Sequence, residues 1–220
     1  MHSRPFSLPG LFLALVSLLS LTALASAQPS SVAVRVVPQK SVYHPSEQLV
    51  LAVVLDHNPG FHTYPAKEQD VLPKAVAEFA IRTEIALTDK PAWLDRVDPV
   101  QWPEPHKSKV ADPEGGPSPI EVPLYSGQSV AFIRATIAAN ARVGDQKLSV
   151  TVKYQACNDK MCEPPVDAEI PVSVTVSAAG EGTPKENEPT LFKSLGATPA
   201  AVPPTTPPTP TAAPAPAPVI

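Results

Sequence analysis

The amino-acid sequence predicts an all-β domain in which two sheets pack face to face, and three observations support this fold class. Branched apolar residues alternate with polar residues over several short stretches, which is the two-residue period of a half-buried strand. No stretch carries a convincing apolar stripe of 3.6-residue period, so helices are not expected between the strands. About six or seven such strands in one ordinary domain are typical of an immunoglobulin-like β-sandwich, here with long loops.

The expected strands can be justified in order along the chain. The first alternates valine with Ala33 and Arg35, and the second is a nearly continuous apolar run. The third places apolar or Thr side chains at every second position from Phe79 to Leu87, and the fourth runs from Val130 and Phe132 to Ile137. The fifth alternates Leu, Val and Tyr with Ser, Thr and Lys, and the sixth alternates Ile and Val with polar residues. A helical alternative over residues 74–78 is too short to favour. The expected strands cover residues 32–36, 49–55, 79–87, 130–137, 148–154 and 170–176.

Two connections between these strands are longer than a sandwich requires. Residues 56–74 carry His62 and Tyr64, and residues 88–127 carry both tryptophans and many prolines. Long ordered loops are where sandwich proteins commonly hold their functional residues. The alternative is that either loop only covers the edge of a sheet.

The first 27 residues have the pattern of a secretory signal peptide. A positive charge at Arg4 precedes an apolar run over residues 11–24, and residues 25–27 (ASA) form a cleavage site, with cleavage expected after Ala27. The apolar run is shorter than the roughly 20 residues that a membrane-spanning helix needs. We therefore expect an exported protein with no membrane span after cleavage, the alternative being an uncleaved anchor.

The sequence divides the remaining chain into a domain over residues 28–177 and a tail over residues 178–220. From Thr198 onward the tail is almost entirely Pro, Ala and Thr, a composition that cannot form a packed core, so we expect it to be disordered and extended. Residues 190–196 (TLFKSLG) are a small apolar island in this tail, which we interpret as incidental. With 17 Lys and Arg against 21 Asp and Glu, the chain is unsuited to nucleic acid.

The chain has two cysteines, Cys157 and Cys162, and they lie between the last two expected strands. A hairpin there would bring their Cα atoms within the roughly 4.4–6.8 Å that a disulfide requires. In an exported protein we expect the two cysteines to be bonded at least part of the time.

Three interpretations of the pair remain open from the residues alone. A structural disulfide is the simplest, but closing so short a loop stabilises a fold by only about 2 kcal/mol, against about 4–5 for a long one. A short polar turn is instead a place where a partner can reach a thiolate, which favours thiol–disulfide exchange. Two thiolates with His57, His62 or His106 could also hold zinc or copper, although the cysteine spacing is at the edge of the usual range.

The residues around the pair carry a family resemblance. Residues 154–165 (YQACNDKMCEPP) resemble the active-site hairpin of the N-terminal (alpha) domain of the DsbD thiol:disulfide interchange proteins. Residues 58–64 (NPGFHTY), 102–105 (WPEP) and 124–127 (LYSG) resemble further segments of that domain and follow in the same order. The resemblance extends over most of the expected domain.

The resemblance implies a redox shuttle without a cofactor in the periplasm. It implies that Cys162 is the nucleophile and Cys157 the resolving thiol of protein-disulfide exchange. Reducing equivalents would come from a membrane electron-transfer protein of the DsbD or CcdA kind, or from a thioredoxin-like protein, and would pass to oxidised exported proteins. The rival function is a non-catalytic exported binding module with a permanent disulfide.

The resemblance also implies which residues surround the two cysteines. Leu124 and Tyr125 would belong to a cap loop that shields the cysteines, and His62 and Tyr64 would line the site. The alternatives are a hydrogen-bonded loop histidine at His62 and a core aromatic at Tyr125. The chain departs from the best-known members in its aliphatic Leu124, its shorter cysteine spacing and its proline-rich continuation, so electrons would have to come from separate proteins.

Overall fold

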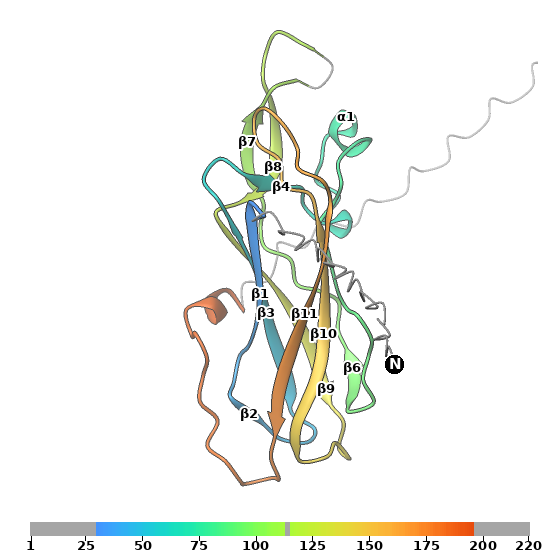
Figure 1. Cartoon of the computed structure of the whole chain (residues 1–220), viewed down its shortest axis with the longest axis vertical. Coiled ribbons are helices and arrows are strands. Elements are labelled where there is room, and N and C mark those ends of the chain that lie inside the picture. The colour runs from blue at the N-terminus through green and yellow to red at the C-terminus, as the bar shows by residue number, and fades with distance from the viewer. Residues whose placement is uncertain (1–29, 113–114, 196–220) are drawn as a thin grey trace, which may run out of the picture.

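A computed structural model describes residues 30–112 and 115–195, and it confirms the predicted all-β sandwich (Figure 1). The expected signal peptide and the proline-rich residues from Thr198 onward lie outside the described residues. Two four-stranded sheets pack face to face, and a smaller three-stranded sheet stands at one end of them. Among the described residues, no helix is long and apolar enough to cross a membrane.

The first sheet of the sandwich is antiparallel throughout, and its long central strands pair over nearly their whole length. Its strands, in spatial order, are β1 (Val32–Pro38), β3 (Gln48–His57), β9 (Gln128–Ile137) and β6 (Leu94–Val97).

The second sheet is built on a long hairpin whose two strands pair from Gly144 opposite Val176 to Tyr154 opposite Val166. The loop of this hairpin contains both cysteines. The strands of this sheet, in spatial order, are β2 (Val42–Tyr43), β11 (Val166–Val176), β10 (Gly144–Tyr154) and β5 (Glu84–Leu87).

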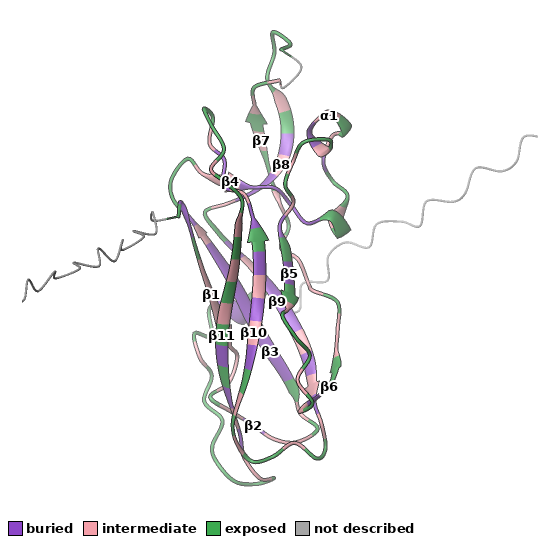
Figure 2. Ribbon diagram, turned by 45° about the vertical axis from the view of Figure 1, so that its right-hand side comes forward, coloured by how far each residue is buried: buried purple, intermediate pink, exposed green. Residues whose placement is uncertain are grey.

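The core lies between the two sheets and consists of the alternate apolar residues that the sequence pattern marks (Figure 2). On β3 the side chains of Leu49, Leu51 and Val53 face this core, and on β10 those of Val150 and Val152 do. Each is at most 1 % exposed. Burying such a side chain contributes about 1.5–3 kcal/mol, so these strands hold the sandwich together without help from the disulfide.

The third sheet corrects the expectation that residues 88–127 form one irregular loop. This stretch holds β6 and also the hairpin of β7 (His106–Val110) and β8 (Ile120–Ser126), which β4 (His62–Thr63) completes. Its many prolines hid these strands from the sequence pattern, because proline interrupts runs of strand-forming residues. The third sheet lies at the end of the sandwich where the loop between β10 and β11 also lies (Figure 1).

Residues 74–87 also differ from the sequence prediction. The disfavoured helical turn does form, as α1 (Lys74–Ala77), and a 3-10 turn precedes it at Lys67–Gln69. The expected strand from residue 79 begins only at Glu84, because Phe79 lies in the turn that follows α1 and is 53 % exposed. The alternation over residues 79–83 was therefore coincidental.

The chain after β11 remains in contact with the sandwich as far as the structure describes it. Residues 178–195 first pass beside the connection from β1 to β2, where Ser41 N donates to Lys185 O at 2.8 Å, and then reach β1, where the Arg35 guanidinium contacts the Glu188 carboxylate at 3.0 Å. A 3-10 turn at Leu191–Ser194 then places Leu191 and Phe192 over the outer face of this sheet. The apolar island is thus not incidental, and residues 178–195 do not behave as the free tail that the sequence predicted.

We expect Phe192→Ala to lower the free energy of unfolding by about 1.5–3 kcal/mol, because the ring is buried against Phe132 with centroids 5.9 Å apart. Urea unfolding followed by circular dichroism measures this change. Val143→Ala is the matched control, since Val143 is 61 % exposed and its truncation should change the free energy of unfolding by no more than about 0.5 kcal/mol. Equal stability of the two variants would show that the segment does not dock.

Candidate functional site: a disulfide in a three-segment ladder

The two cysteines form a disulfide across a very short antiparallel ladder. Cys157 lies opposite Cys162 with their Cα atoms 4.0 Å apart, and the prediction that they bond is confirmed. The flanking backbone closes the ladder, since Glu163 N donates to Ala156 O at 2.8 Å and Asn158 N donates to Met161 O at 2.9 Å. The cysteines occupy the position between these bonds, where opposed side chains come closest together.

A polar turn joins the two cysteines and is held by one side chain. Asn158 Oδ1 accepts hydrogen bonds from the backbone N–H groups of Lys160 and Met161, at 2.9 and 3.0 Å. Asparagine in this role fixes a tight turn without help from the rest of the fold. Asp159, Lys160 and Met161 are all exposed, so solvent surrounds the turn.

The base of the cysteine loop is fixed to the first strand of the sandwich. The Glu163 carboxylate accepts hydrogen bonds from the Ser31 hydroxyl and from its backbone N–H. The Tyr154 hydroxyl, at the end of β10, donates to Val32 O at 3.1 Å. These bonds hold the two stems of the loop, so the disulfide sits on a fixed base.

The two sulfur-bearing residues differ sharply in exposure. Cys157 is 2 % exposed and belongs to an apolar cluster with Tyr64, Val76 and Leu124, whereas Cys162 is exposed. A partner thiolate can therefore approach the Cys162 side of the bond more readily than the Cys157 side. Thiol–disulfide exchange depends on which sulfur can be reached, so this asymmetry gives the two cysteines different chemical roles.

β4 extends the cysteine ladder by one segment. His62 N donates to Cys157 O, and Cys157 N donates to His62 O, each at 2.9 Å. On its other side, His62 lies opposite Ser126 of β8. Residues directly opposite in an antiparallel ladder place their side chains on the same face, so His62, Cys157 and Cys162 point to one side of this small sheet.

The strand pairing shows on which face of the small sheet each of the six predicted site residues lies. Alternation along β4 and β8 puts Tyr64 and Leu124 on the same face as the cysteines and His62, and both pack in the Cys157 cluster. Tyr125 belongs to the opposite face, since it pairs with Thr63. Five of the residues are brought together, and Tyr125 is not.

Neither Leu124 nor Tyr125 lies in a loop, because both belong to the regular strand β8 and are 1 % exposed. The Tyr125 hydroxyl donates to Gln69 Oε1, and Gln69 Nε2 donates to Pro103 O at 2.9 Å. Burial raises the pKa of Tyr125 above its ordinary range. The expected cap loop is thus replaced by a strand. Leu124 packs in the cluster that buries Cys157, and the Tyr125 hydrogen bond to Gln69 joins β8 to the 3-10 turn before α1.

A pocket of about 150 Å³ opens beside the disulfide. Three rings follow one another along it, because the His62 and Tyr64 rings meet edge to face at 5.9 Å and the Tyr64 and Phe79 rings at 6.4 Å. Phe79, Val110 and Asp159 line this pocket and were not expected from the sequence. Phe79 was hidden by its apparent place in a strand, whereas Asp159 could have been found from its position between the cysteines.

The titration of His62 is governed by its surroundings. Burial lowers the pKa of His62, the negative charge of Asp159 opposes this effect, and His57 reinforces it. Burial also raises the pKa of Tyr64. At neutral pH the pocket therefore presents a neutral imidazole and a protonated phenol to the sulfur atoms.

His57 supports the site from behind. Its Nδ1–H donates to Gly127 O at 2.8 Å, and its Nε2 accepts a hydrogen bond from the Thr63 hydroxyl at 3.1 Å. Because a carbonyl can only accept, the Gly127 partner places a proton on Nδ1, and the Thr63 hydroxyl can then donate to Nε2 of the neutral imidazole. The histidine thereby fastens the end of β3 to β4 and to the turn between β8 and β9.

We expect acidification to destabilise the protein through His57. Burial lowers the pKa of this histidine in the folded state, so the unfolded chain binds a proton at a pH where the native protein does not. The stability that the neutral His57 contributes is fully present above the ordinary histidine pKa of about 6.5. It is lost as the pH falls below that pKa. Urea unfolding at pH 7.5 and pH 5 measures the loss. His57→Gln should weaken this pH dependence, whereas the exposed His106→Gln should preserve it.

The metal alternative finds no ready site in the structure. Within residues 30–112 and 115–195, no three side chains of His, Cys, Asp or Glu are arranged to hold a metal ion. Two of the histidines considered for such a site are not placed to share a metal ion. Both ring nitrogens of His57 are hydrogen-bonded, and His106 is exposed at the start of β7.

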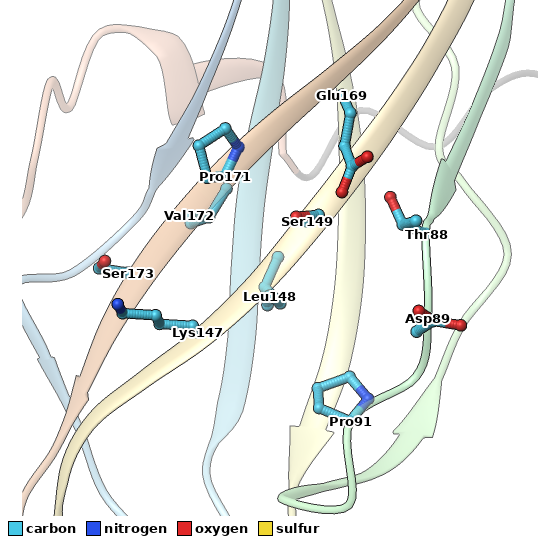
Figure 3. A pocket seen from close by; sticks show the side chains of 10 residues that line it. All are labelled: Thr88, Asp89, Pro91, Lys147, Leu148, Ser149, Glu169, Pro171, Val172 and Ser173. Carbon is cyan, nitrogen blue, oxygen red and sulfur yellow. The ribbon is translucent and has the colours of Figure 1, made fainter.

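A second, larger pocket lies away from the disulfide, on the outer face of the second sheet (Figure 3). Its walls come from β10, β11 and the segment after β5, and it holds neither cysteine nor histidine. Lys147 and Glu169 both lie at this pocket in Figure 3. It has no reactive group comparable to the disulfide, so we place the candidate site at the cysteine ladder.

Similar solved structures include the N-terminal periplasmic domain of ScsB from Proteus mirabilis, at 15% identity and a TM-score of 0.44, covering 69% of this chain and 49% of that one. The chain thus spans about half the length of that structure. The N-terminal domain of DsbD from Neisseria meningitidis in the reduced form has 16% identity and a TM-score of 0.29, with 70% and 90% of the two chains covered.

A type I cohesin of ScaB from Pseudobacteroides cellulosolvens has 13% identity and a TM-score of 0.34, covering 68% of this chain and 96% of that one. No curated protein matches the sequence. The sequence profile of the N-terminal domain of the thiol:disulfide interchange protein DsbD matches residues 32–173, which is well over half of the chain. The chain therefore belongs to the family of DsbD N-terminal domains.

Proposed function

We propose that this protein is a periplasmic thiol–disulfide interchange module that relays reducing equivalents through Cys157 and Cys162. The observation that carries the proposal is the asymmetry of the bond, in which an exposed Cys162 is joined to a buried Cys157 on a short surface turn. Membership of a family named for thiol:disulfide interchange supports the same function.

The recharging step begins with a donor protein that carries a dithiol. A donor thiolate attacks the sulfur of the exposed Cys162, forms a mixed disulfide and displaces the sulfur of Cys157, which takes up a proton. The second donor thiol then attacks the donor side of that mixed disulfide and releases Cys162. The donor leaves oxidised, and the pair is left as two thiols.

The delivery step reverses the flow of electrons. The Cys162 thiolate attacks a disulfide of an exported protein, and one sulfur of that disulfide leaves as a thiolate. Cys157 then attacks Cys162 and releases the second sulfur of the substrate. The ladder supplies the proximity for this second attack, since it holds the Cα atoms 4.0 Å apart in the bonded state.

A purely structural disulfide fits this position poorly. The bond closes a turn whose cysteines are five positions apart and which Asn158 already fixes, so its contribution on the loop-entropy model is only about 2 kcal/mol. The sandwich has a large core of its own between two four-stranded sheets. A permanent staple would stabilise the fold more if it joined distant strands.

The partners are those that membership of this family implies. The donor would be a membrane electron-transfer protein of the DsbD or CcdA kind or a thioredoxin-like protein, and the acceptors would be oxidised proteins in the same compartment. The signal-peptide pattern of residues 1–27 supports the periplasm as that compartment. The pair uses no cofactor of its own.

A redox titration tests this proposal against the rival binding module. The purified protein is equilibrated with mixtures of reduced and oxidised glutathione or thioredoxin, and the fraction of free thiol is measured after rapid alkylation. We expect a reduction potential above about −300 mV, in the range of disulfides that exchange with protein thiols. A bond that stays intact below about −300 mV would instead indicate a structural disulfide and a non-catalytic binding module.

A further inference from the structure

Release of the substrate poses a chemical problem that the burial of Cys157 creates. The attacking species in disulfide exchange is a thiolate, and burial in an apolar cluster favours the neutral thiol instead. Cys157 is 2 % exposed and packs against Tyr64, Val76 and Leu124. Water is thus poorly placed to accept its proton, and a base within the site is needed.

His62 is the residue whose position fits this task. It is the direct cross-strand neighbour of Cys157, bonded to it through both backbone N–H groups at 2.9 Å. Side chains of such a pair lie on one face with Cβ atoms about 5.5 Å apart or less. His62, Cys157 and Cys162 also line the same pocket, and the edge-to-face contact with Tyr64 holds the imidazole there.

We propose that His62 is the general base of the release step, accepting the proton of the Cys157 thiol as that sulfur attacks the mixed disulfide at Cys162. The inference rests on the proposed exchange function and assigns a catalytic role within it. The new bond forms between the sulfurs of Cys157 and Cys162, and the bond from Cys162 to the substrate breaks. The substrate sulfur takes the electron pair, so the two cysteines are oxidised and the substrate is reduced. The proton passes from Cys157 to the imidazole and then to solvent or to the departing sulfur.

The other ionisable groups around the imidazole are less suited to this role. The groups that line the pockets on either side of His62 are His57 from β3, Tyr64 after β4, Lys109 from β7 and Asp159 from the turn. Lys109 is a cation, Tyr64 keeps its proton because burial raises its pKa, and both ring nitrogens of His57 are engaged. The Asp159 carboxylate is exposed on the turn and does not belong to the ladder that pairs with Cys157.

The protonation state of His62 also suits a base. Burial lowers its pKa below the ordinary value, so the imidazole is neutral and free to accept a proton at neutral pH. Asp159 opposes this shift, and would stabilise the imidazolium once the proton has been transferred. General bases placed in this way typically accelerate a step by about 10²–10⁴-fold.

The test separates attack from release in a single reaction. Fully reduced protein is mixed with one equivalent of the aromatic disulfide dithionitrobenzoate in a stopped-flow instrument, and the coloured thiolate is followed from pH 5 to 9. The first thiolate reports attack by Cys162, and the second reports release by Cys157. The variants are His62→Gln and, as the matched control, the exposed His106→Gln.

We expect His62→Gln to slow the second release about 10²-fold at pH 7 and to leave the first release within about twofold. In this variant the second rate should rise steadily with pH. In the unaltered protein and in His106→Gln it should level off above an inflection below pH 6.5. An unchanged second release, an equal slowing of both releases, or a wild-type rate without such an inflection would overturn the role of His62. Failure of the exchange function is distinct, because the wild-type pair would then resist reduction in the redox titration.

Discussion

Replacing Cys162 by alanine is expected to abolish mixed-disulfide formation with partner proteins, whereas Cys157→Ala should allow it and make the product persist. Cys162 is exposed on the polar turn, while Cys157 is buried in the apolar cluster that contains Leu124. The remaining thiol of Cys157→Ala can still attack a substrate disulfide, but no resolving thiol follows. The measurement is covalent capture from a periplasmic extract, resolved on non-reducing gels.

The difference between the two variants should exceed about a hundredfold in captured protein, because thiol exchange requires access to the attacking sulfur. The double variant, with both cysteines replaced by alanine, is the control for non-covalent association. Equal capture by the two single variants would contradict the assignment of Cys162 as the nucleophile. Preferential capture by Cys162→Ala would reverse it.

Leu124→Ala is expected to lower the free energy of unfolding by about 2–5 kcal/mol, the usual loss for a leucine truncated in a well-packed core. Leu124 is 1 % exposed and packs in the cluster that covers Cys157. The cavity should also admit small reagents to the buried sulfur. In the reduced protein, iodoacetamide should therefore modify Cys157 faster in Leu124→Ala than in the unaltered protein, as followed by mass spectrometry.

Leu124→Met is the matched control for this prediction, because it keeps most of the side-chain volume. It should lower the free energy of unfolding by less than about 1.5 kcal/mol. Modification of Cys162 serves as an internal reference, since its exposure does not depend on Leu124. If Cys157 in Leu124→Ala remained as unreactive as in Leu124→Met, the leucine would not be what shields it.

The sandwich was predictable because most of its strands have one buried and one polar face. The alternation over residues 148–154 and 170–176 matches β10 and β11, and the cysteines fall in the hairpin loop as expected. The stretch over residues 88–127 was not predictable, because proline breaks the strand pattern on which recognition depends.

A signal for the docked C-terminal segment was present in β3. Residues 49–55 are apolar without alternation, which means that both faces of this strand are covered. One face packs in the core of the sandwich, and Val50, Ala52 and Val54 on the other face pack against Leu191 and Phe192. The apolar island and the unalternating strand explain each other, but only the structure places them together.

The arrangement of the site depended on pairings between distant segments. His62 and Cys157 are far apart in the chain, and their direct opposition follows from a ladder that no local pattern contains. The prediction that Leu124 and Tyr125 both shield the cysteines assumed that they lie in a loop. In a strand, neighbouring side chains must point to opposite faces, so Leu124 packs in the Cys157 cluster while Tyr125 bonds to Gln69.

The most direct test of the account is rapid-quench exchange between the oxidised protein and a reduced thioredoxin-like donor. Acid quenching, alkylation and peptide mapping would identify the cysteine that carries the donor in the transient complex. We predict that the Cys157–Cys162 bond is reduced and that the donor is attached through Cys162. A bond that the donor leaves intact, or a complex formed through Cys157, would contradict the account.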